Sequence, residues 1–503
     1  MSTDTENKIS PKSADGKPLN AEAANAVQRL QAVKDKLDAT STSFCLAKWN
    51  QVTIHLTNGT THSCHHCPPH KIPLDELKKN VSALHNTNDK KEKRKMMLEG
   101  KRPEECNFCW RIEDLNNPNL FSDRVRKSAT SWNDDRINTV PQMPWDVDII
   151  PKSLELDFSN ACNFKCLYCT PAYSSTWTKE IREHGSIHAG AFITNSLKQL
   201  EMESRLPIED EDSNPYIKAF WEWFPGIIAS GELRELRLTG GEPLLSKNTF
   251  KLMDYFIEHP QPEMMFSVNT NLGAPKLYID KLITYLNRIA EANAAKRITV
   301  YTSGEAYGKR GEYIRAGLNY KTWYENVDRI FTECPKVEMV FMCTYNAMSV
   351  TSFKDFLTDS YYLIEKHTRS LDRVQPLVIS IPYLRQPEYM SAWILTEDYL
   401  RYMEECVQYM NERIRKVEVD VHIPGGYRVT KPGFPELCAQ EMERVLEVMK
   451  KAIVEGIGRS DIAVIRRAFH QFIDECDSRR GTSFLSVFPE MTRFYLDCKD
   501  QYP

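Results

Sequence analysis

From residue 152 onward, short runs of apolar and β-branched residues alternate with longer segments whose apolar residues recur at helical spacing. Such alternation predicts strands connected by helices, as in parallel βαβ units. Six runs are expected to form strands, and they are residues 153–158, 233–239, 264–270, 297–303, 337–345 and 376–382. Helices are expected between them, for example over residues 245–259 and 276–294. The pattern predicts an α/β fold, with a partial (β/α)6 TIM-like barrel over residues 151–396.

The segments before and after this region do not show the alternation of strands and helices. Before it we expect a disordered tail and one helix (1–42, the helix over 20–39), a small cysteine-rich domain (43–112) and a connecting region (113–150). After it, residues 397–503 form a helical C-terminal region, with helices expected over 397–423 and 435–456. The basic run 90–95 is expected to be a solvated helix face.

Composition narrows the class of protein. Of 503 residues, 41% are hydrophobic and 27% charged, and the formal net charge is -4. Near balance of charge gives no general indication of nucleic acid or an anionic membrane as partner. We see no apolar segment long enough to span a membrane and no secretory signal, so we expect a cytoplasmic protein. In a reducing compartment its 14 cysteines favour metal binding or catalysis over disulfides.

Three cysteines follow the first expected strand in the segment SLELDFSNACNFKCLYCTP. Cys162, Cys166 and Cys169 are spaced C-x3-C-x2-C, and thiolates are the usual ligands of iron–sulfur clusters. A loop after a parallel strand lies at the end of the barrel where such folds build active sites. Three thiolates leave one metal position open, whereas a structural zinc site has four protein ligands. A zinc knuckle or three unrelated thiols is the alternative.

With Tyr168 before its last cysteine, this loop resembles the signature of the radical S-adenosylmethionine superfamily. The resemblance implies that the three thiolates hold a [4Fe–4S] cluster and that S-adenosylmethionine binds the fourth iron. One electron from the cluster would then cleave the cofactor to a 5′-deoxyadenosyl radical, which abstracts hydrogen from a substrate. Tyr168 would lie near the adenine.

A second motif, Gly240-Gly241-Glu242-Pro243, ends the next expected strand. Glycines allow a close backbone approach to a ligand, and a carboxylate accepts hydrogen bonds from an amine. The motif resembles the GGE motif of the same superfamily, which contacts the methionyl amino group. An ordinary turn is the alternative.

Ser303 and Arg315 are the remaining cofactor candidates. Ser303 ends the fourth expected strand, and Arg315 lies in GEYIRAGLNY, similar to family members in which a Ser and an Arg bind the cofactor carboxylate. A guanidinium fork suits a carboxylate. The alternative for Arg315 is an ordinary helix-surface arginine in a salt bridge.

Another group of cysteines precedes the barrel. An alternating segment with an Asn58-Gly59 turn predicts a hairpin that brings Cys64 towards Cys45. Cys106 and Cys109 follow as C-x2-C, so the residues favour a four-thiolate site for zinc or iron–sulfur.

This pattern resembles the SPASM/twitch domains of radical S-adenosylmethionine enzymes, which usually follow the barrel rather than precede it. The resemblance implies an auxiliary iron–sulfur cluster, with zinc as the alternative. Cys67 is the expected spare thiol, although Cys64 and Cys67 could exchange roles. The other six cysteines are scattered and are expected to be buried thiols.

The C-terminal sequence DSRRG, followed by an apolar segment, resembles the ending of phage-encoded twitch-type radical S-adenosylmethionine proteins. Arg479 and Arg480 are expected to cap a helix or to pair with Asp474 and Glu475, and contact with a substrate is the alternative.

Together these motifs predict a radical S-adenosylmethionine enzyme, reduced by a flavodoxin or ferredoxin, that acts on a peptide or protein. A small molecule or nucleotide is the alternative substrate. The alternative class is a non-catalytic metal-binding module, in which the cysteines hold domains together.

Overall fold

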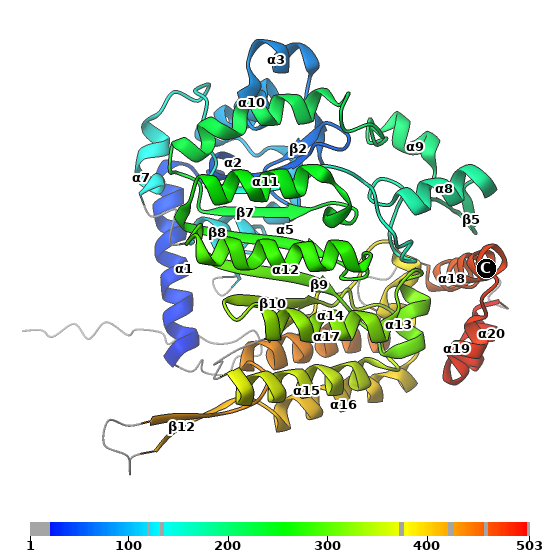
Figure 1. Ribbon diagram of the computed structural model, residues 1–503. Helices are drawn as coiled ribbons and strands as arrows, with labels where there is room; N and C mark the ends of the chain where they lie inside the picture. Colours follow the sequence, from blue (N-terminus) through cyan, green and yellow to red (C-terminus); the bar gives the residue numbers. More distant parts are fainter. Residues whose placement is uncertain are drawn as a thin grey trace, which may run out of the picture. The chain divides into compact units, whose positions relative to one another are not determined.

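The computed structural model describes residues 21–117, 120–130, 135–371, 377–420, 427–456 and 461–499 (Figure 1). The tail expected over residues 1–20 lies outside this set. The chain forms two compact units. The N-terminal unit comprises Met1–Leu156 and Asp212–Leu236, and the C-terminal unit comprises Asp157–Glu211 and Arg237–Pro503. Among the described helices, none has the length and apolarity needed to cross a membrane.

A three-stranded antiparallel meander lies in the N-terminal unit. Strand β1 (Gln51–His55) pairs with β2 (Thr60–His62), which pairs with β3 (His70–Lys71). The predicted hairpin is therefore confirmed, with His55 opposite Thr60. Gly59 has φ +66°, a conformation that favours glycine, and a Cβ atom there would lie 2.0 Å from the ring of Tyr216.

Short helices surround this meander and build the core of the unit. Helix α1 (Ala21–Thr40) confirms the helix predicted over 20–39, and its buried Leu37 packs in one cluster with Phe44, Trp49 and Trp110. The other helices of the unit are α2 (Ala47–Asn50), α3 (Leu74–Lys79), α4 (Asn88–Leu98), α5 (Asn107–Glu113), α6 (Asp123–Ser128), α7 (Arg136–Thr139) and α10 (Pro215–Ala229).

Helix α4 overturns the expectation that residues 90–95 form a solvated face. Lys90, Arg94 and Met97 are all buried, because positions i, i+4 and i+7 lie on one side of a helix and that side faces the interior. Lys90 Nζ donates to Thr61 Oγ1 at 2.7 Å, and Arg94 Nε donates to the carbonyl of Lys48 at 3.1 Å. The sequence did not reveal this buried face, because its residues at positions 90 and 94 are basic instead of apolar.

All six predicted strands are present. They are β4 (Ser153–Asp157), β7 (Glu235–Thr239), β8 (Gln261–Thr270), β9 (Ala295–Ser303), β10 (Val337–Met342) and β11 (Leu377–Ser380). In the C-terminal unit β8, β9, β10 and β11 lie in that order and are parallel, with Val300 opposite both Val268 and Met339. The fold is thus mixed α/β with a parallel sheet, as predicted, while closure into a partial barrel stays a prediction.

Amphipathic helices connect these parallel strands. They are α11 (Lys247–Glu258), α12 (Lys276–Glu291), α13 (Gly308–Ile314), α14 (Tyr320–Glu333) and α15 (Phe353–Leu371). In Figure 1, α11, α12 and α14 lie side by side along the strands, and their inward faces carry buried residues such as Phe256, Leu282 and Val327. The crossovers place the carboxyl ends of the strands at one edge, where α/β proteins build their sites.

Two further groups of elements complete the C-terminal unit. After the cysteine loop come α8 (Ser175–His184), β5 (Ile187–Ala189), β6 (Phe192–Thr194) and α9 (Leu197–Met202). The end of the chain forms α16 (Leu400–Glu412), β12 (Lys416–Asp420), β13 (Tyr427–Lys431), α17 (Glu436–Val454), α18 (Ile462–Arg480), α19 (Phe484–Val487) and α20 (Thr492–Lys499).

The helical C-terminal region is confirmed over 435–456 but is wrong after Glu412. There the sequence KVEVD alternates valines with charged residues, which is strand periodicity, and β12 pairs with β13 in an antiparallel hairpin. The six scattered cysteines are buried thiols, as predicted, namely Cys334, Cys343, Cys406, Cys438, Cys476 and Cys498.

Candidate active site and metal centre

The three-cysteine loop follows β4 and folds back on itself through its own backbone. The N–H of Cys169 donates to the carbonyl of Cys166 at 2.9 Å, and the indole N–H of Trp177 donates to the same carbonyl at 2.8 Å. The N–H of Phe164 points at the sulfur of Cys162, 3.4 Å away. The three predicted thiols thus lie on one short, hydrogen-bonded loop, and their joint binding of a metal stays a prediction.

Burial and mutual proximity make these thiols hard to ionise without a cation. Burial raises the pKa of Cys169 to about 12, and it raises the pKa values of Cys162 and Cys166 as well. Cys162 and Cys169 each also feel the charge of Cys166, which raises their pKa values further. Since the metal ligand is the thiolate, this donor set fits a cluster whose irons supply the compensating positive charge.

The Gly-Gly-Glu-Pro turn packs directly against the cysteine loop. The N–H groups of Gly241 and Glu242 donate to the carbonyls of Ser159 and Ala161 at 3.2 and 2.7 Å. A Cβ atom on Gly241 would lie 2.5 Å from the carbonyl oxygen of Ala161. The two glycines therefore serve close packing of two loops in this structure, while contact of Gly240 and Gly241 with a cofactor stays a prediction.

Glu242 is 1% exposed, and its carboxylate is held from the next strand. The hydroxyl of Thr270 donates to Oε1 at 2.8 Å, and the N–H of Asn271 donates to Oε2 at 2.7 Å. Pro243 begins the short turn of 3-10 helix behind it, whose Leu244 N–H also donates to Oε1. Burial raises the pKa of Glu242 to about 7, against the lowering effect of these hydrogen bonds. A cationic amine beside this carboxylate would restore its charge, which fits the predicted role.

Arg315 is buried and does not lie free for a ligand. Its Nε donates to Glu305 Oε1 and Oε2 at 3.0 and 2.9 Å, and its Nη2 donates to Oε2 at 2.5 Å. The hydroxyl of Tyr168 donates to Glu305 Oε1 at 3.0 Å. Arg315 thus forms a salt bridge, as the alternative expected, but the bridge is buried and not on a helix surface, and contact of Arg315 with a cofactor stays a prediction. Ser303, the last residue of β9, lies opposite Met342, and its role stays a prediction.

The DSRRG segment contacts helix α8, which follows the cysteine loop. Arg480 pairs with Glu180 on α8 at 3.3 Å and lies 4.6 Å from the ring centre of Trp177. Arg479 pairs with Glu475 at 2.7 Å, as predicted, and donates to the carbonyl of Gly185 at 2.9 Å. These contacts give both arginines a structural role.

In the N-terminal unit five thiols line one small cavity. They are Cys45, Cys64, Cys67, Cys106 and Cys109. Cys67, the expected spare, lies 3.9 Å from Cys106, sulfur to sulfur, so the structure gives no reason to set it aside. Burial raises the pKa of Cys45 to about 12 and that of Cys109 to about 11. As in the three-cysteine loop, the donor set fits a thiolate-bound metal.

Two buried cations, Lys48 and Arg124, line this cavity. Lys48 lies 3.7 Å from the sulfur of Cys67 and forms an ion pair with Glu105, and Arg124 pairs with Asp38 and Glu113. Lys90 and Arg94, by contrast, form no ion pair with any carboxylate in the described part of the chain. Lys90 is close enough to Cys67 for their charges to interact. A buried charge without a partner is costly, so Lys90 fits a site that carries net negative charge when filled.

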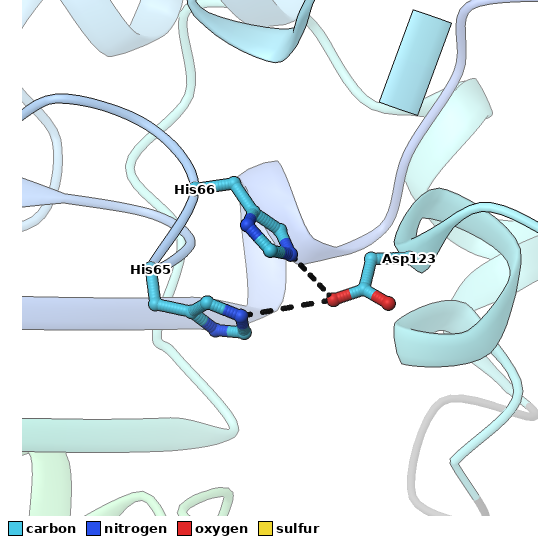
Figure 2. A group of neighbouring side chains, drawn as sticks. All are labelled: His65, His66 and Asp123. Carbon is cyan, nitrogen blue, oxygen red and sulfur yellow. Dashed lines mark hydrogen bonds and ion pairs between the residues drawn. The ribbon is translucent and has the colours of Figure 1, made fainter. Parts of the chain in front are cut away.

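His65, His66 and Asp123 form a group at this cavity, and His66 and Asp123 are part of its lining (Figure 2). His66 Nε2 lies 2.8 Å from Asp123 Oδ2, and its ring stacks on Phe108. An ammonium can only donate, so Nδ1 of His65 accepts from Lys127 Nζ at 3.2 Å, and the ring hydrogen is then on Nε2, facing Asp123. This arrangement is a hydrogen-bonded group and needs no metal ion.

Sequence reasoning missed Glu305 and the buried Lys48, Lys90 and Arg94. Glu305 stood two residues beyond an expected strand, where a carboxylate is a common surface residue. The i, i+4 spacing of Lys90 and Arg94 was visible, but a basic helix face is ordinarily solvated.

Comparison with known proteins adds little. No known family profile matches the sequence, and no curated protein sequence matches it significantly. Among solved structures, Streptococcus suis SuiB bound to precursor peptide SuiA is similar at TM-score 0.33 and 12% identity, over 77% of this chain and 71% of that chain. SuiB bound to S-adenosylmethionine is similar at TM-score 0.31 and 12% identity, over 72% of this chain and 69% of that chain. Both TM-scores are low, and the function is therefore argued from the residues of this chain alone.

Proposed function

We propose that this protein is a radical S-adenosylmethionine enzyme whose cluster is held by Cys162, Cys166 and Cys169. The observation that carries the proposal is the joint arrangement of the cysteine loop and the Gly-Gly-Glu-Pro turn. One buried and two partly buried thiols lie on one loop, and the buried carboxylate of Glu242 is fixed against that same loop. A metal site that only held the fold together would need no such carboxylate.

When bound, the cluster would supply the electron that cleaves S-adenosylmethionine to a 5′-deoxyadenosyl radical. The three thiolates would hold three irons, and Glu242 would accept hydrogen bonds from the methionyl amino group. Backbone hydrogen bonds between the two loops would hold the thiolates and the carboxylate of Glu242 at a fixed separation. A flavodoxin or ferredoxin would deliver the electron.

For the N-terminal unit we propose a thiolate-bound metal, with an auxiliary iron–sulfur cluster as the first candidate. The buried ammonium of Lys90, which interacts electrostatically with Cys67, supports an anionic centre of either kind. One observation favours zinc as the second candidate. The sulfurs of Cys67 and Cys106 are 3.9 Å apart, close to the edge of about 3.8 Å that a tetrahedral site with Zn–S bonds of about 2.3 Å requires.

A peptide or protein remains the proposed substrate. The precursor peptide named for SuiB is in keeping with that choice, but its structural likeness is too weak to add support. A small molecule or nucleotide is the alternative.

The decisive experiment is anaerobic reconstitution followed by measurement of 5′-deoxyadenosine with dithionite and S-adenosylmethionine. Cys162→Ala, Cys166→Ala and Cys169→Ala should each abolish its formation, because each thiolate holds one iron. Cys406→Ala, which removes a buried thiol far along the sequence, is the control and should retain it. Equal 5′-deoxyadenosine from wild type and the three loop variants contradicts the proposal.

A further inference from the structure

Glu305 and Arg315 form a buried ion pair in the C-terminal unit. Their side chains are 0% and 7% exposed. Glu305 follows β9 and Arg315 follows α13, so the two residues flank the short segment that contains α13. Each oxygen of Glu305 accepts from Arg315, and Oε1 also accepts from Tyr168. Nε and Nη2 of the guanidinium therefore both donate to Glu305.

The segment carrying Arg315 is fastened to the cysteine loop on both sides of Cys166. The N–H of Lys165 donates to the carbonyl of Ala316, and the N–H of Leu167 donates to the carbonyl of Ile314, both at 2.9 Å. Arg315 and Cys166 are thus held opposite each other by backbone hydrogen bonds. The position of the guanidinium does not depend on the side-chain ion pair alone.

Only one nitrogen of the guanidinium faces away from Glu305. Nη1 lies 3.7 Å from the sulfur of Cys166, within hydrogen-bond distance for a sulfur acceptor. The carbon of the guanidinium also lies 5.5 Å from the ring centre of Tyr168, so the ring limits sideways movement. With Nε and Nη2 fixed by Glu305, Nη1 is directed at the thiol.

We propose that Arg315 is a hydrogen-bond donor to the cluster ligand Cys166 rather than a clamp for the cofactor carboxylate, and that Glu305 is the positioning residue that directs it. This inference rests on the proposed function, since it needs a cluster on Cys166. Hydrogen bonds to the ligand sulfurs are one of the factors that set cluster potentials. A cationic donor stabilises the more negative, reduced cluster and so raises its midpoint potential.

The test is a redox titration of the reconstituted full-length protein without S-adenosylmethionine, followed by electron paramagnetic resonance. The barrel signal is the one that the Cys162→Ala/Cys166→Ala/Cys169→Ala variant lacks. Arg315→Lys keeps the charge but cannot reach both Glu305 and the sulfur. We expect its equilibrium constant for one-electron reduction to fall about tenfold, which is a shift of about 59 mV to more negative potential. Cofactor affinity should stay within about threefold of wild type.

Glu305→Asp tests the positioning role separately. It keeps the net charge and withdraws the carboxylate by one methylene, so the potential should fall as in Arg315→Lys. The double variant should shift no further than the larger single shift, because the two residues act through one hydrogen bond. Arg310→Lys, in the helix α13 that precedes Arg315, pairs with Glu490 and is the matched control, so it should leave the potential unchanged.

The outcomes separate cleanly. An unmoved potential in both single variants, or a tenfold loss of cofactor affinity in Arg315→Lys, overturns the proposal. Additive shifts in the double variant overturn the positioning role of Glu305. A wild-type protein that takes up no cluster is instead a failure of the proposed function.

Discussion

Gly241 lies so close to Ala161 that a Cβ atom added to it would sit 2.5 Å from the Ala161 carbonyl oxygen. Backbone faces backbone here, so neither side can move as a flexible side chain would. The contact joins the turn that carries Glu242 to the loop that carries the three thiols. It is the reason these two motifs, about 80 residues apart in the printed sequence, form one site.

We expect Gly241→Ala to push the cysteine loop away and to reduce cluster content after reconstitution. Overpacking of this kind costs roughly 1–3 kcal/mol of stability. Iron analysis and urea unfolding measure the two effects.

Gly226→Ala is the matched control for this prediction. Gly226 lies inside α10, where a Cβ atom would meet nothing within 4 Å. Alanine in a helix interior should stabilise the protein by up to about 1 kcal/mol and leave the cluster intact. Normal iron content in Gly241→Ala would mean that the loop relaxes without losing its shape.

Glu242 should give the metal-free protein a characteristic pH dependence. Burial raises its pKa from an ordinary 4.5 to about 7. Between these values the unfolded chain has released the proton while the folded protein still holds it, so the free energy of unfolding falls as pH rises. A shift of this size corresponds to about 3 kcal/mol, lost by pH 7 and above.

Urea unfolding at pH 5.5 and 7.5 checks this prediction. Glu242→Gln should remove part of the fall in stability between the two pH values, because it carries no titratable proton. Glu235→Gln, on the same strand β7, should keep the wild-type dependence. Identical slopes in wild type and Glu242→Gln would show that this carboxyl is already ionised in the folded protein.

The sequence predicted those elements that depend on residues near each other in the chain. The six strands and the hairpin at Asn58-Gly59 follow from apolar runs and turn residues that neighbour each other in the chain, and all are present. The helix expected to continue past Glu412 failed because a valine alternation of five residues is shorter than the window used to judge helical spacing.

Long-range contacts were beyond the sequence signal. Glu305 and Arg315 are ten residues apart, but what matters is their approach to Cys166, which depends on backbone pairing between distant segments. The glycines of the turn were interpreted as space for a ligand. In the structure Gly241 makes space for the carbonyls of Asn160 and Ala161, and Gly240 for that of Ser159. Spacing can identify a donor set, but it cannot say which of five thiols share a metal.

The N-terminal unit should keep its metal when the barrel site is destroyed. We expect about eight irons per chain in the wild type, from two cubane clusters, and about four in Cys162→Ala/Cys166→Ala/Cys169→Ala. Iron, acid-labile sulfide and zinc analysis on the same samples checks this. One zinc and no iron in the variant would replace the auxiliary cluster with a structural zinc site, and a folded variant without metal would contradict both.

Lys90 should act in opposite directions on the metal-free and metal-loaded protein. Its ammonium is 1% exposed, donates to Thr61 Oγ1, and is close enough to Cys67 for their charges to interact. Without metal, the buried charge lacks a counter-ion and is costly. Lys90→Met should therefore stabilise the metal-free protein by roughly 1–3 kcal/mol.

With metal bound, the thiolates carry net negative charge, and the same substitution removes a favourable interaction. We expect Lys90→Met to lose its N-terminal metal to a chelator about tenfold faster than wild type, measured in the background that lacks the three barrel cysteines. Lys93→Met, on the same helix α4 but paired with Asp89 nearer the surface, should change neither quantity. Destabilisation of both forms by Lys90→Met would indicate a packing role for the lysine stem, because a counter-ion role requires the two effects to differ in sign.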